Sequence, residues 1–457
     1  MAMNRFIEAS NFCDLITDGT HNSPKKSEDG ILLVTSKNII NSKLDLSKAY
    51  YISENDAQEI NRRSKVDKFD ILISMIGTVG EVCLIEEEPN FVVKNVGILK
   101  NKEKYKAKWL YFYLKSNFAK NIIRERLKGT TQQYLSLGEL RKLPILTPID
   151  KNHLISTINI LDSLEKKIEL NTQTNQTLEQ IAQGIFKHWF IDFAPVHAKA
   201  NALASGASPE QAELAAMACL SGKTVEKITT LKAQDPTAYH QLQQTAAAFP
   251  SEFVETEIGQ VPKGWEVKKV KNIGKVICGK TPSKAKEEFY GDDIPFIKIP
   301  DMHNNIFIIN TSDKLSLLGA ESQKNKFIEK GSICISCIAT VGIVSIASRS
   351  SQTNQQINSI IPNSEILTEF LYLYFSQENT KSYLKILASG GSTTLNLNTT
   401  AFSNIKLLVP DEYLLAQFHR KTSSTFNKIL LNYKENNSLQ KIRDELLPKL
   451  LNGEIEL

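Results

Sequence analysis

The amino-acid sequence predicts an α+β protein built from two similar α/β domains, each followed by one long helix. Two observations predict this fold. A four–three spacing of apolar and Asn residues from Leu154 to Trp189 recurs from Leu415 to Leu450, at an offset of 261. Strand, turn and helix patterns that precede the first spacing recur before the second, at offsets of 261 or 262. Two copies indicate an internal duplication rather than a solenoid.

The four–three spacing is typical of the seam of a long packed helix. Asn171 and Asn175 recur as Asn432 and Asn436, and a buried Asn fixes the register of paired helices because a slipped partner leaves its amide unpaired. We therefore expect the two helices to pack together, each about 54 Å long at 1.5 Å per residue. The full seams are Leu154, Thr157, Leu161, Leu164, Ile168, Asn171, Asn175, Leu178, Ala182, Ile185 and Trp189, and Leu415, Phe418, Thr422, Thr425, Ile429, Asn432, Asn436, Leu439, Arg443, Leu446 and Leu450.

Residues 1–150 are expected to form the first α/β domain. β-Branched apolar runs closed by glycines indicate strands, and apolar residues at helical spacing indicate a helix. The expected elements are a strand and tight turn at 70–80, strands at 81–85 and 91–99 with a turn at 86–90, a helix at 109–127, a polar break at 129–133 and short apolar pieces at 135–148.

Residues 251–411 are expected to form the second domain. Ile333–Gly342 repeats Ile71–Gly80, and Phe370–Leu387 repeats the aromatic helix. Gly390-Gly-Ser-Thr-Thr394 repeats the polar break. The long helices are assigned to 151–194 and 412–457. Residues 195–250 form an Ala-rich connector, in which short helices such as 210–220 are the only structure expected.

Length and composition set the broad class. At 457 residues the chain is too long for one core. A formal charge of +5 and a pI near 8.6 permit a nucleic-acid partner without requiring one. Because no apolar run approaches a membrane span and the first ten residues lack a secretory core, we expect a cytoplasmic protein that does not contact a membrane.

Two motifs suggest chemistry that the repeat argues against. Cys334 and Cys337 have CxxC spacing, but they align with Leu72 and Met75 of the first copy, so we expect core residues and no metal site. Gly274–Thr281 matches a phosphate loop, yet Pro282 follows at once with no periodic helix behind it. A polar, glycine-containing loop at the start of each domain, Asp18–Pro24 and Gly279–Ser283, explains the motif better.

No catalytic motif for methyl transfer, dinucleotide binding, metalloproteolysis, serine hydrolysis or nuclease activity is present. The histidines are scattered, so we expect no catalytic residues and no cofactor. Basic residues instead cluster among polar ones in both domains, which favours contact with DNA phosphates and base edges. These clusters are Lys25–Lys26, Arg62–Lys65, Arg124–Lys128, Lys284–Lys286 and Lys324–Lys326.

The order of motifs along this duplicated chain resembles the DNA-specificity subunit of Type I restriction-modification systems. The motifs are Gly279-Lys-Thr-Pro-Ser283, Gly291–Lys298, Gly77-Thr-Val-Gly80 with Ile335–Gly342, Phe186–Val196, Ile258–Glu266 and Leu446–Glu454. The resemblance covers nearly the whole chain. The connector departs from it, because it is longer than such a segment needs to be.

The resemblance implies two target recognition domains separated by a pair of long antiparallel coiled-coil helices, arranged with pseudo-twofold symmetry. It implies a non-catalytic subunit whose domains each recognise one half of a bipartite double-stranded DNA site. Two methyltransferase subunits would dock on the helices and methylate adenine with S-adenosylmethionine that they bind themselves. Restriction subunits would complete the full complex. The halves of the DNA site should differ, because the domains differ more than the helices do.

Loop residues are the candidates for DNA contact. They are Thr20, His21, Asn22, Lys25, Lys26, Thr130, Thr131 and Gln132 in the first domain, and Lys280, Ser283, Lys284, Ser392, Thr393 and Thr394 in the second. Two other functions remain open: a coiled-coil assembly scaffold without its own DNA specificity, and a self-contained DNA-modifying enzyme.

Overall fold

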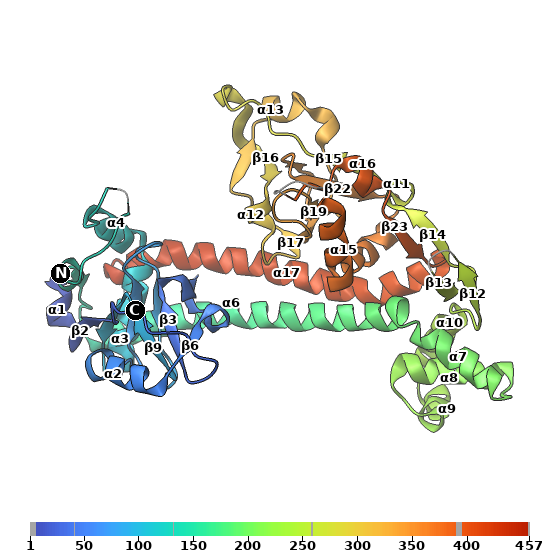
Figure 1. Ribbon diagram of the computed structural model, residues 1–457, viewed down its shortest axis with the longest axis horizontal. Helices are drawn as coiled ribbons and strands as arrows, with labels where there is room; N and C mark the ends of the chain where they lie inside the picture. Colours follow the sequence, from blue (N-terminus) through green and yellow to red (C-terminus); the bar gives the residue numbers. More distant parts are fainter. Residues whose placement is uncertain (1–5, 41, 131, 257–258, 390–394, 456–457) are drawn as a thin grey trace. The chain divides into compact units, whose positions relative to one another are not determined.

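The computed structural model describes residues 6–40, 42–130, 132–256, 259–389 and 395–455. The chain divides into two compact units: Met1–Leu170 with Asn436–Leu457, and Asn171–Glu435. Each unit holds one α/β domain with one stretch of helix α6 (Lys151–Phe186) and one stretch of helix α17 (Glu412–Leu451) (Figure 1).

The first domain is built on a four-stranded antiparallel sheet in the order β2-β10-β7-β8. The central strand β7 is buried on both faces, which explains its continuous apolar sequence. Ile71 and Ile73 pack with Trp109 of helix α3, whereas Leu72 packs with Val93 on the other face. The bounds are β2 (Leu15–Asp18), β7 (Ile71–Ser74), β8 (Val82–Leu84), β10 (Val96–Lys100) and α3 (Lys104–Lys115).

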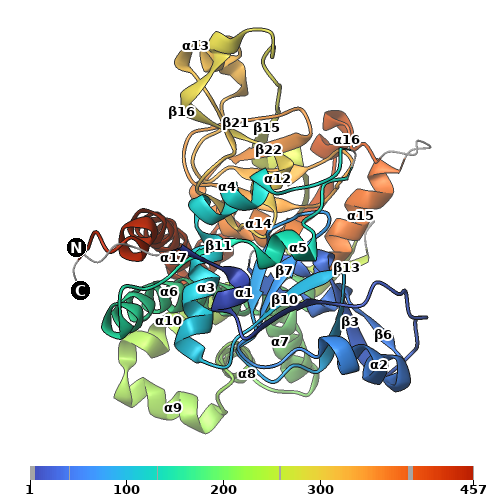
Figure 2. The same cartoon turned by 90° about the vertical axis from the view of Figure 1, so that its left-hand side faces the viewer.

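A second sheet, in the order β6-β3-β9, lies against that other face. Strand β3 (Ile31–Thr35) pairs antiparallel with β6 (Tyr50–Ile52) and parallel with β9 (Phe91–Lys94). Helix α2 (Glu54–Ser64) follows β6 and buries Ala57 and Ile60 against this sheet. Figure 2 faces the first unit and shows β3, β6 and α2 grouped together.

Strand β1 (Phe6–Glu8) pairs antiparallel with β11 (Pro144–Leu146), so the chain enters and leaves the first domain at adjacent points. The remaining elements are α1 (Ala9–Phe12), η1 (Ser36–Asn38), β4 (Ile39–Ile40), β5 (Lys43–Leu44), η2 (Leu46–Lys48), α4 (Asn117–Glu125) and α5 (Leu137–Arg141).

The second domain repeats this topology. Its sheet β15-β22-β19-β20-β17 matches β2-β10-β7-β8 with one added strand, and β18-β16-β21 matches β6-β3-β9, including the parallel pair. The β14–β23 pair matches β1–β11. The expected duplication is therefore confirmed. The strands are β14 (Glu266–Lys269), β15 (Gly274–Cys278), β16 (Tyr290–Ile297), β17 (Phe307–Ile308), β18 (Asp313–Leu315), β19 (Ile333–Ser336), β20 (Val344–Ala347), β21 (Gln352–Thr353), β22 (Ile357–Pro362) and β23 (Lys406–Val409).

Helices cover the second domain in the same order as the first. They are α11 (Val270–Ile273), η4 (Glu287–Phe289), α12 (Ile299–Met302), α13 (Leu317–Glu321), η5 (Lys324–Lys326), η6 (Glu365–Leu367), α14 (Thr368–Ser376), α15 (Glu378–Ala388) and α16 (Thr399–Ser403). Strands β12 (Phe253–Thr256) and β13 (Gly259–Pro262) pair ahead of the domain.

Two expected elements are split by single residues. The strand expected at 91–99 is two strands in different sheets, because Asn95 has a φ of 54° and turns the chain between them. The helix expected at 109–127 breaks at Ser116, whose hydroxyl accepts from the Ala119 amide at 3.2 Å and donates to the Tyr113 carbonyl at 2.6 Å. Serine favours such caps over a helix interior. The counterpart at 370–387 breaks at Gln377.

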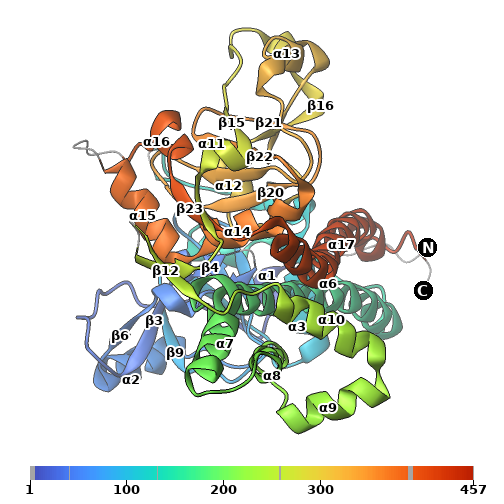
Figure 3. The same cartoon turned by 90° about the vertical axis from the view of Figure 1, so that its right-hand side faces the viewer.

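The Ala-rich connector folds into four helices, shown in green in Figure 3. Ser208, Thr224 and Asp235 each cap the start of a helix by accepting from a backbone amide. Ala216, Met217, Ile228 and Ala246 form its own small core. The bounds are α7 (Ala194–Ala204), α8 (Pro209–Ser221), α9 (Val225–Gln234) and α10 (Pro236–Ala247). More of the segment is helical than the sequence led us to expect.

Within each unit the two long helices pack antiparallel. Every residue of both expected seams is buried or half-buried. In the first unit the Asn436 amide donates to the Ile168 carbonyl at 3.2 Å, and in the second the Asn432 amide donates to the Asn175 side-chain oxygen at 2.8 Å. The Asn171 amide donates to Glu435 at 2.8 Å, also in the second unit.

The C-terminal end of α6 lies in the main core of the second unit. A π-helical turn, η3 (Lys187–Ile191), continues α6 and buries Trp189 and Phe190. Phe190 packs edge-on against Phe370 and Phe418, with ring centroids 5.2 and 4.9 Å away. Aromatic pairs with this geometry add stability beyond the area they bury. The long helix is thereby joined to both α14 and α17.

The phosphate-loop motif lies largely in a strand, and the two cysteines of the CxxC motif lie in the core. Gly274–Cys278 is strand β15, not a loop before a helix. Cys334 and Cys337 are buried free thiols, and burial raises their pKa to about 12 and about 11. Among the residues that the structure describes, no group of three or more His, Cys, Asp or Glu could hold a metal ion. None of the helices within the described residues is long and apolar enough to span a bilayer.

Candidate nucleic-acid interface

The loops predicted to contact DNA leave one end of the first domain's main sheet. Asp18 at the end of β2, Gly97 in β10 and Ile73 in β7 pair in register across the sheet. Tyr134 bridges to Ile76, just beyond β7, and to Lys128. The loop that begins at Thr20 and the loop that ends at Tyr134 therefore lie at the same sheet end, although they are far apart in sequence.

A buried carboxylate organises the first of these loops. The Asp18 side chain is 6% exposed. One of its oxygens accepts from the Arg63 guanidinium at 2.5 Å, and the other lies 3.0 Å from His21 Nε2. His21 Nδ1 lies 2.9 Å from the Asn95 side-chain oxygen. The Arg63 and His21 side chains remain 61% and 65% exposed. Asp18 thus holds two polar groups at the surface: the Arg63 guanidinium keeps N–H groups that can donate to an anionic partner, whereas both ring nitrogens of His21 already have partners.

The backbone of the same loop is held close to β9. A Cβ at Gly19 would lie 2.4 Å from the Val93 carbonyl oxygen, so only glycine fits there. The Thr20 amide donates to that carbonyl at 3.1 Å, and the Asn22 amide to the Thr20 hydroxyl at 3.2 Å. This arrangement leaves the side chain of Asn22 exposed.

Lys25 and Lys26 follow on the exposed part of the loop. The Lys26 ammonium lies 5.1 Å from the centroid of the Tyr50 ring. In the second predicted loop, Thr130 and Gln132 are exposed, and Gly129 supplies the positive φ of 91° that the turn requires. Thr131 lies outside the described residues.

The second domain presents the same sheet end with different chemistry. Cys278, Asn358 and Ile335 pair in register there, and Asn396 bridges to Ile338. The Lys280 side chain is exposed, while its carbonyl accepts from the Gln323 amide at 2.9 Å. Ser283 and Lys284 are exposed farther along the loop, and Ser392, Thr393 and Thr394 lie outside the described residues.

In the second domain a buried glutamine, Gln323, contacts the loop at this sheet end, where the first domain has the buried carboxylate of Asp18. The Gln323 side chain is 4% exposed and also donates to the Gln352 oxygen at 2.7 Å. Thr281, which follows Lys280 as His21 follows Thr20, donates to the Gln355 side-chain oxygen at 2.5 Å. One domain therefore presents Arg63 and His21 at this sheet end, and the other presents Lys280 and the exposed amide of Gln355.

Two features of these sheet ends were not among the residues predicted to contact DNA. Arg63 is brought to the loop by Asp18, and its position in a basic cluster was the available signal. A turn also recurs: the Glu81 amide donates to Ser74 Oγ at 2.9 Å, and the Ile343 amide to Ser336 Oγ at 2.9 Å. This turn leaves Thr78 and Thr340 exposed at equivalent places, as the shared Thr-Val-Gly sequence could have indicated.

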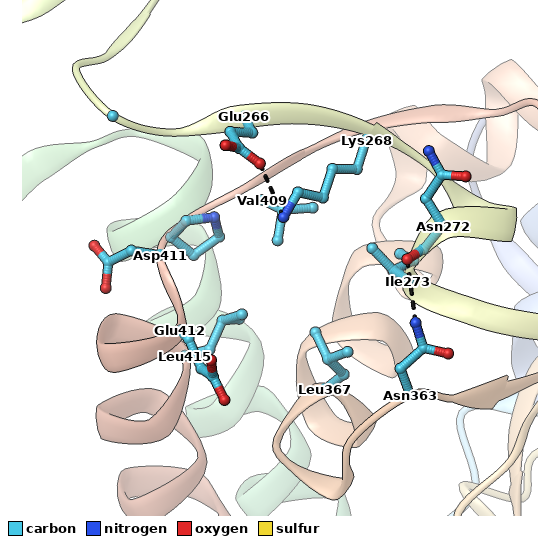
Figure 4. Close-up of a pocket in the computed structure, with 12 residues that line it drawn as sticks. Glu266, Lys268, Asn272, Ile273, Asn363, Leu367, Val409, Asp411, Glu412 and Leu415 are labelled. Atoms are coloured by element: carbon cyan, nitrogen blue, oxygen red, sulfur yellow. Dashed lines mark hydrogen bonds and ion pairs between the residues drawn. The ribbon is translucent and has the colours of Figure 1, made fainter.

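A cavity of about 300 Å³ in the second unit lies elsewhere, between the β14–β23 pair and the start of α17 (Figure 4). Two pairs of residues in its polar lining contact each other. Lys268 lies 2.9 Å from Glu266, and the Asn363 amide donates to the Asn272 carbonyl at 3.1 Å. We assign it no binding role.

Comparison with known proteins agrees with the family resemblance seen in the sequence. Residues 7–180 and 262–440 match the family model described as Type I restriction modification DNA specificity domain. The chain is 47% identical over 405 residues to the Type I restriction enzyme HindI specificity subunit of Haemophilus influenzae, covering 86% of this chain and 88% of that protein. It is 34% identical over 201 residues to the Type I restriction enzyme MjaIX specificity subunit of Methanocaldococcus jannaschii, covering 43% of this chain and 46% of that protein.

A solved structure shares the fold. The Type I restriction-modification S subunit from M. genitalium aligns with a TM-score of 0.50 at 16% identity, covering 98% of this chain and 95% of that one. At this identity the likeness concerns the arrangement of elements alone. The two domains and two long helices therefore have a counterpart of known structure.

Proposed function

The chain belongs to the Type I restriction-modification DNA specificity family, and we propose that its two α/β domains each recognise one half of a bipartite DNA site. It is a specificity subunit with a role in DNA recognition. The finer proposal concerns how that recognition is divided between the domains and which residues carry it.

One observation supports the proposal most directly: the two domains share the same strand pairing at this sheet end, but the side chains on its loops differ. The first site consists of Asp18 with Arg63 and His21. At the second, Lys280 and Gln355 are exposed, and the buried Gln323 holds the Lys280 carbonyl. Arg and Lys pair well with guanine or phosphate, while amides pair with adenine. Two domains of one topology but different loop chemistry suit a site whose halves differ in sequence.

The long helices supply the second part of the proposal. A fixed register between them, set by Asn171, Asn175, Asn432 and Asn436, would hold the two recognition domains at a constant separation. Recognition of two half-sites needs such a constant distance along the duplex. The DNA site should then contain a gap of one length.

Catalysis is assigned to partner subunits. We propose that two methyltransferase subunits dock on the helices and methylate adenine in each half-site with S-adenosylmethionine that they bind. Restriction subunits would join this complex to give the nuclease. The proposed location is the cytoplasm, where the chromosome is found.

The test is to co-express the chain with the methyltransferase subunit of its system and to map methyladenine across the host genome. We expect one split motif with unequal halves and a gap of fixed length. A continuous motif, or methylation without sequence preference, would contradict the division between domains. Without any sequence preference, the scaffold function would replace the proposal. Methyl transfer or cleavage by the purified chain alone would favour the enzyme instead.

A further inference from the structure

Tyr134 and Asn396 occupy equivalent places at the two sheet ends, although their side chains differ. They are 262 positions apart in the sequence, which is an offset of the duplication. Tyr134 bridges antiparallel to Ile76, two residues beyond β7, and Asn396 bridges antiparallel to Ile338, two residues beyond β19. One backbone position therefore carries a tyrosine in the first domain and an asparagine in the second.

The backbone at this position is anchored in the same way in both domains. The Leu135 amide donates to the Met75 carbonyl at 2.9 Å, and the Leu397 amide donates to the Cys337 carbonyl at 2.8 Å. Both leucines are 1% exposed. The residue after each leucine caps the start of a short helix, α5 in the first domain and α16 in the second. A side chain on such a fixed backbone is held in a defined place, as recognition requires.

Both side chains leave this backbone toward the surface. Side chains alternate along extended backbone, so the buried leucines turn Tyr134 and Asn396 outward. Tyr134 is 41% exposed, and Asn396 is exposed as well. Neither the Tyr134 hydroxyl nor the Asn396 side-chain amide makes a hydrogen bond with the residues that the structure describes. At the same sheet end Thr281, by contrast, is already bonded to Gln355.

The Tyr134 ring has support on one side. A Cβ at Gly129 would lie 3.5 Å from Tyr134 Cδ1, so the ring lies against the bare backbone of that glycine. Lys128 and Tyr134 also exchange two backbone hydrogen bonds, each 2.9 Å long. The ring is thereby placed beside an exposed lysine at the sheet end where DNA contact is proposed.

We propose that Asn396 contacts adenine and that Tyr134 contacts the methyl group of thymine, each in its own half-site. An asparagine amide pairs with N6 and N7 of adenine in the major groove, and an aromatic ring packs on the thymine methyl group. Neither residue type carries a positive charge, so neither suits phosphate neutralisation. The inference rests on the proposed function and adds one base-contacting residue to each domain.

Competition binding of DNA to the full chain assembled with its methyltransferase subunit tests both contacts. The methyladenine map of the wild-type system supplies the target motif. Single thymines are replaced with uracil, which lacks the methyl group, and single adenines with 7-deazaadenine, which lacks the N7 acceptor. Wild-type affinity should fall roughly 4-fold for uracil in one half-site, the effect of one buried methyl group. It should fall roughly 5-fold or more for 7-deazaadenine in the other half-site.

Alanine variants assign each effect to a residue. Y134A should lose the uracil effect and keep the 7-deazaadenine effect, and N396A should do the reverse. F118A and N379A are the matched controls, because Phe118 and Asn379 are another exposed aromatic and asparagine pair at equivalent positions. Both controls should keep both effects. Survival of both effects in Y134A and N396A would overturn the proposal, as would an equal loss of affinity for every duplex.

Conservative variants decide the matter if an alanine variant unfolds below the wild-type temperature in circular dichroism. Y134F keeps the ring and should keep the uracil effect. N396D keeps the size of the side chain but has no amide to donate to N7, so it should lose the 7-deazaadenine effect. Loss of the uracil effect in Y134F, or survival of the 7-deazaadenine effect in N396D, would contradict the assigned contact.

Failure of these contacts is distinguishable from failure of the recognition proposal. A split wild-type motif without either base effect would remove the two contacts and leave recognition by two domains intact. A wild-type motif that is not split would remove the division between domains, and with it the assignment of one contact to each half-site.

Discussion

The side-chain amide of Asn432 donates a 2.8 Å hydrogen bond to the side-chain oxygen of Asn175, across the seam between the two long helices. Both residues are buried, and the Asn432 oxygen has no partner among the described atoms. An unpaired buried oxygen costs stability, so this contact suits register control better than maximal stability.

We predict that N175A and N432A each lower the free energy of unfolding by about 1–3 kcal/mol, because each leaves its partner unpaired. A double-mutant cycle should give a coupling energy of about 0.5–3 kcal/mol. Urea unfolding measures all four corners of the cycle. Additive effects would mean that the pair does not act as a unit.

Arg63 should contact DNA through its exposed guanidinium. We predict that R63A weakens binding of the chain's target DNA by about 1–3 kcal/mol, because it removes the cation that Asp18 holds at the sheet end. Fluorescence anisotropy of the assembled complex measures this. R62A changes the neighbouring exposed arginine on the same helix and should have a smaller effect. Equal losses would argue for a diffuse electrostatic contribution.

Lys25 and Lys26 should contact phosphate rather than bases. Replacing both with alanine should weaken binding to all DNA sequences alike and reduce the slope of log affinity against log salt by about 0.9 for each phosphate that is no longer neutralised. A salt titration with target and non-target duplexes measures both effects. An unchanged slope would remove the pair from the interface.

Glu165 should make stability depend on pH. Burial raises its pKa, but Lys115 and Arg443, each 2.8 Å away, lower it more, so the pKa lies below the usual 4.5. A lowered folded-state pKa stabilises the protein above the unfolded value, and the contribution is lost as pH falls through the folded value.

The E165Q variant should therefore lose about 1–3 kcal/mol at pH 7, less than a fully buried pair because the Glu165 side chain is 27% exposed. The difference from wild type should shrink below about pH 4.5, as thermal unfolding across pH can measure. E169Q breaks the more exposed pair with Lys43 and should cost only about 0–1 kcal/mol. A pH-independent loss in E165Q would show that charge is not the cause.

Phe249 joins the connector to the core of the second unit. Its ring is 2% exposed and meets Trp189 edge-on at 5.2 Å. F249A should lower the unfolding free energy by about 3–5 kcal/mol through the cavity it creates, whereas V254A, at an exposed strand position, should change it by less than about 0.5 kcal/mol. Wild-type-like unfolding of F249A would mean that the connector is not part of that core.

The helix seams were predictable because their positions repeat at a four–three spacing that is typical of packed long helices. The breaks at Asn95 and Ser116 were not, since each lies within an apolar run and depends on one residue's local backbone preference. At the sheet end, the loop residues near Thr20 could be named in advance. The contact between Asp18 and Arg63 could not, because 45 positions separate them and only the fold brings them together.

Each domain begins and ends on a two-stranded pair, β1 with β11 and β14 with β23, so its two ends leave the rest of the chain side by side. We expect a domain attached in this way to be exchangeable: another of the same topology could replace it without displacing the helix that follows. If each domain recognises one half-site as proposed, exchange of one domain would create a new combination of half-sites while the long helices stay unchanged.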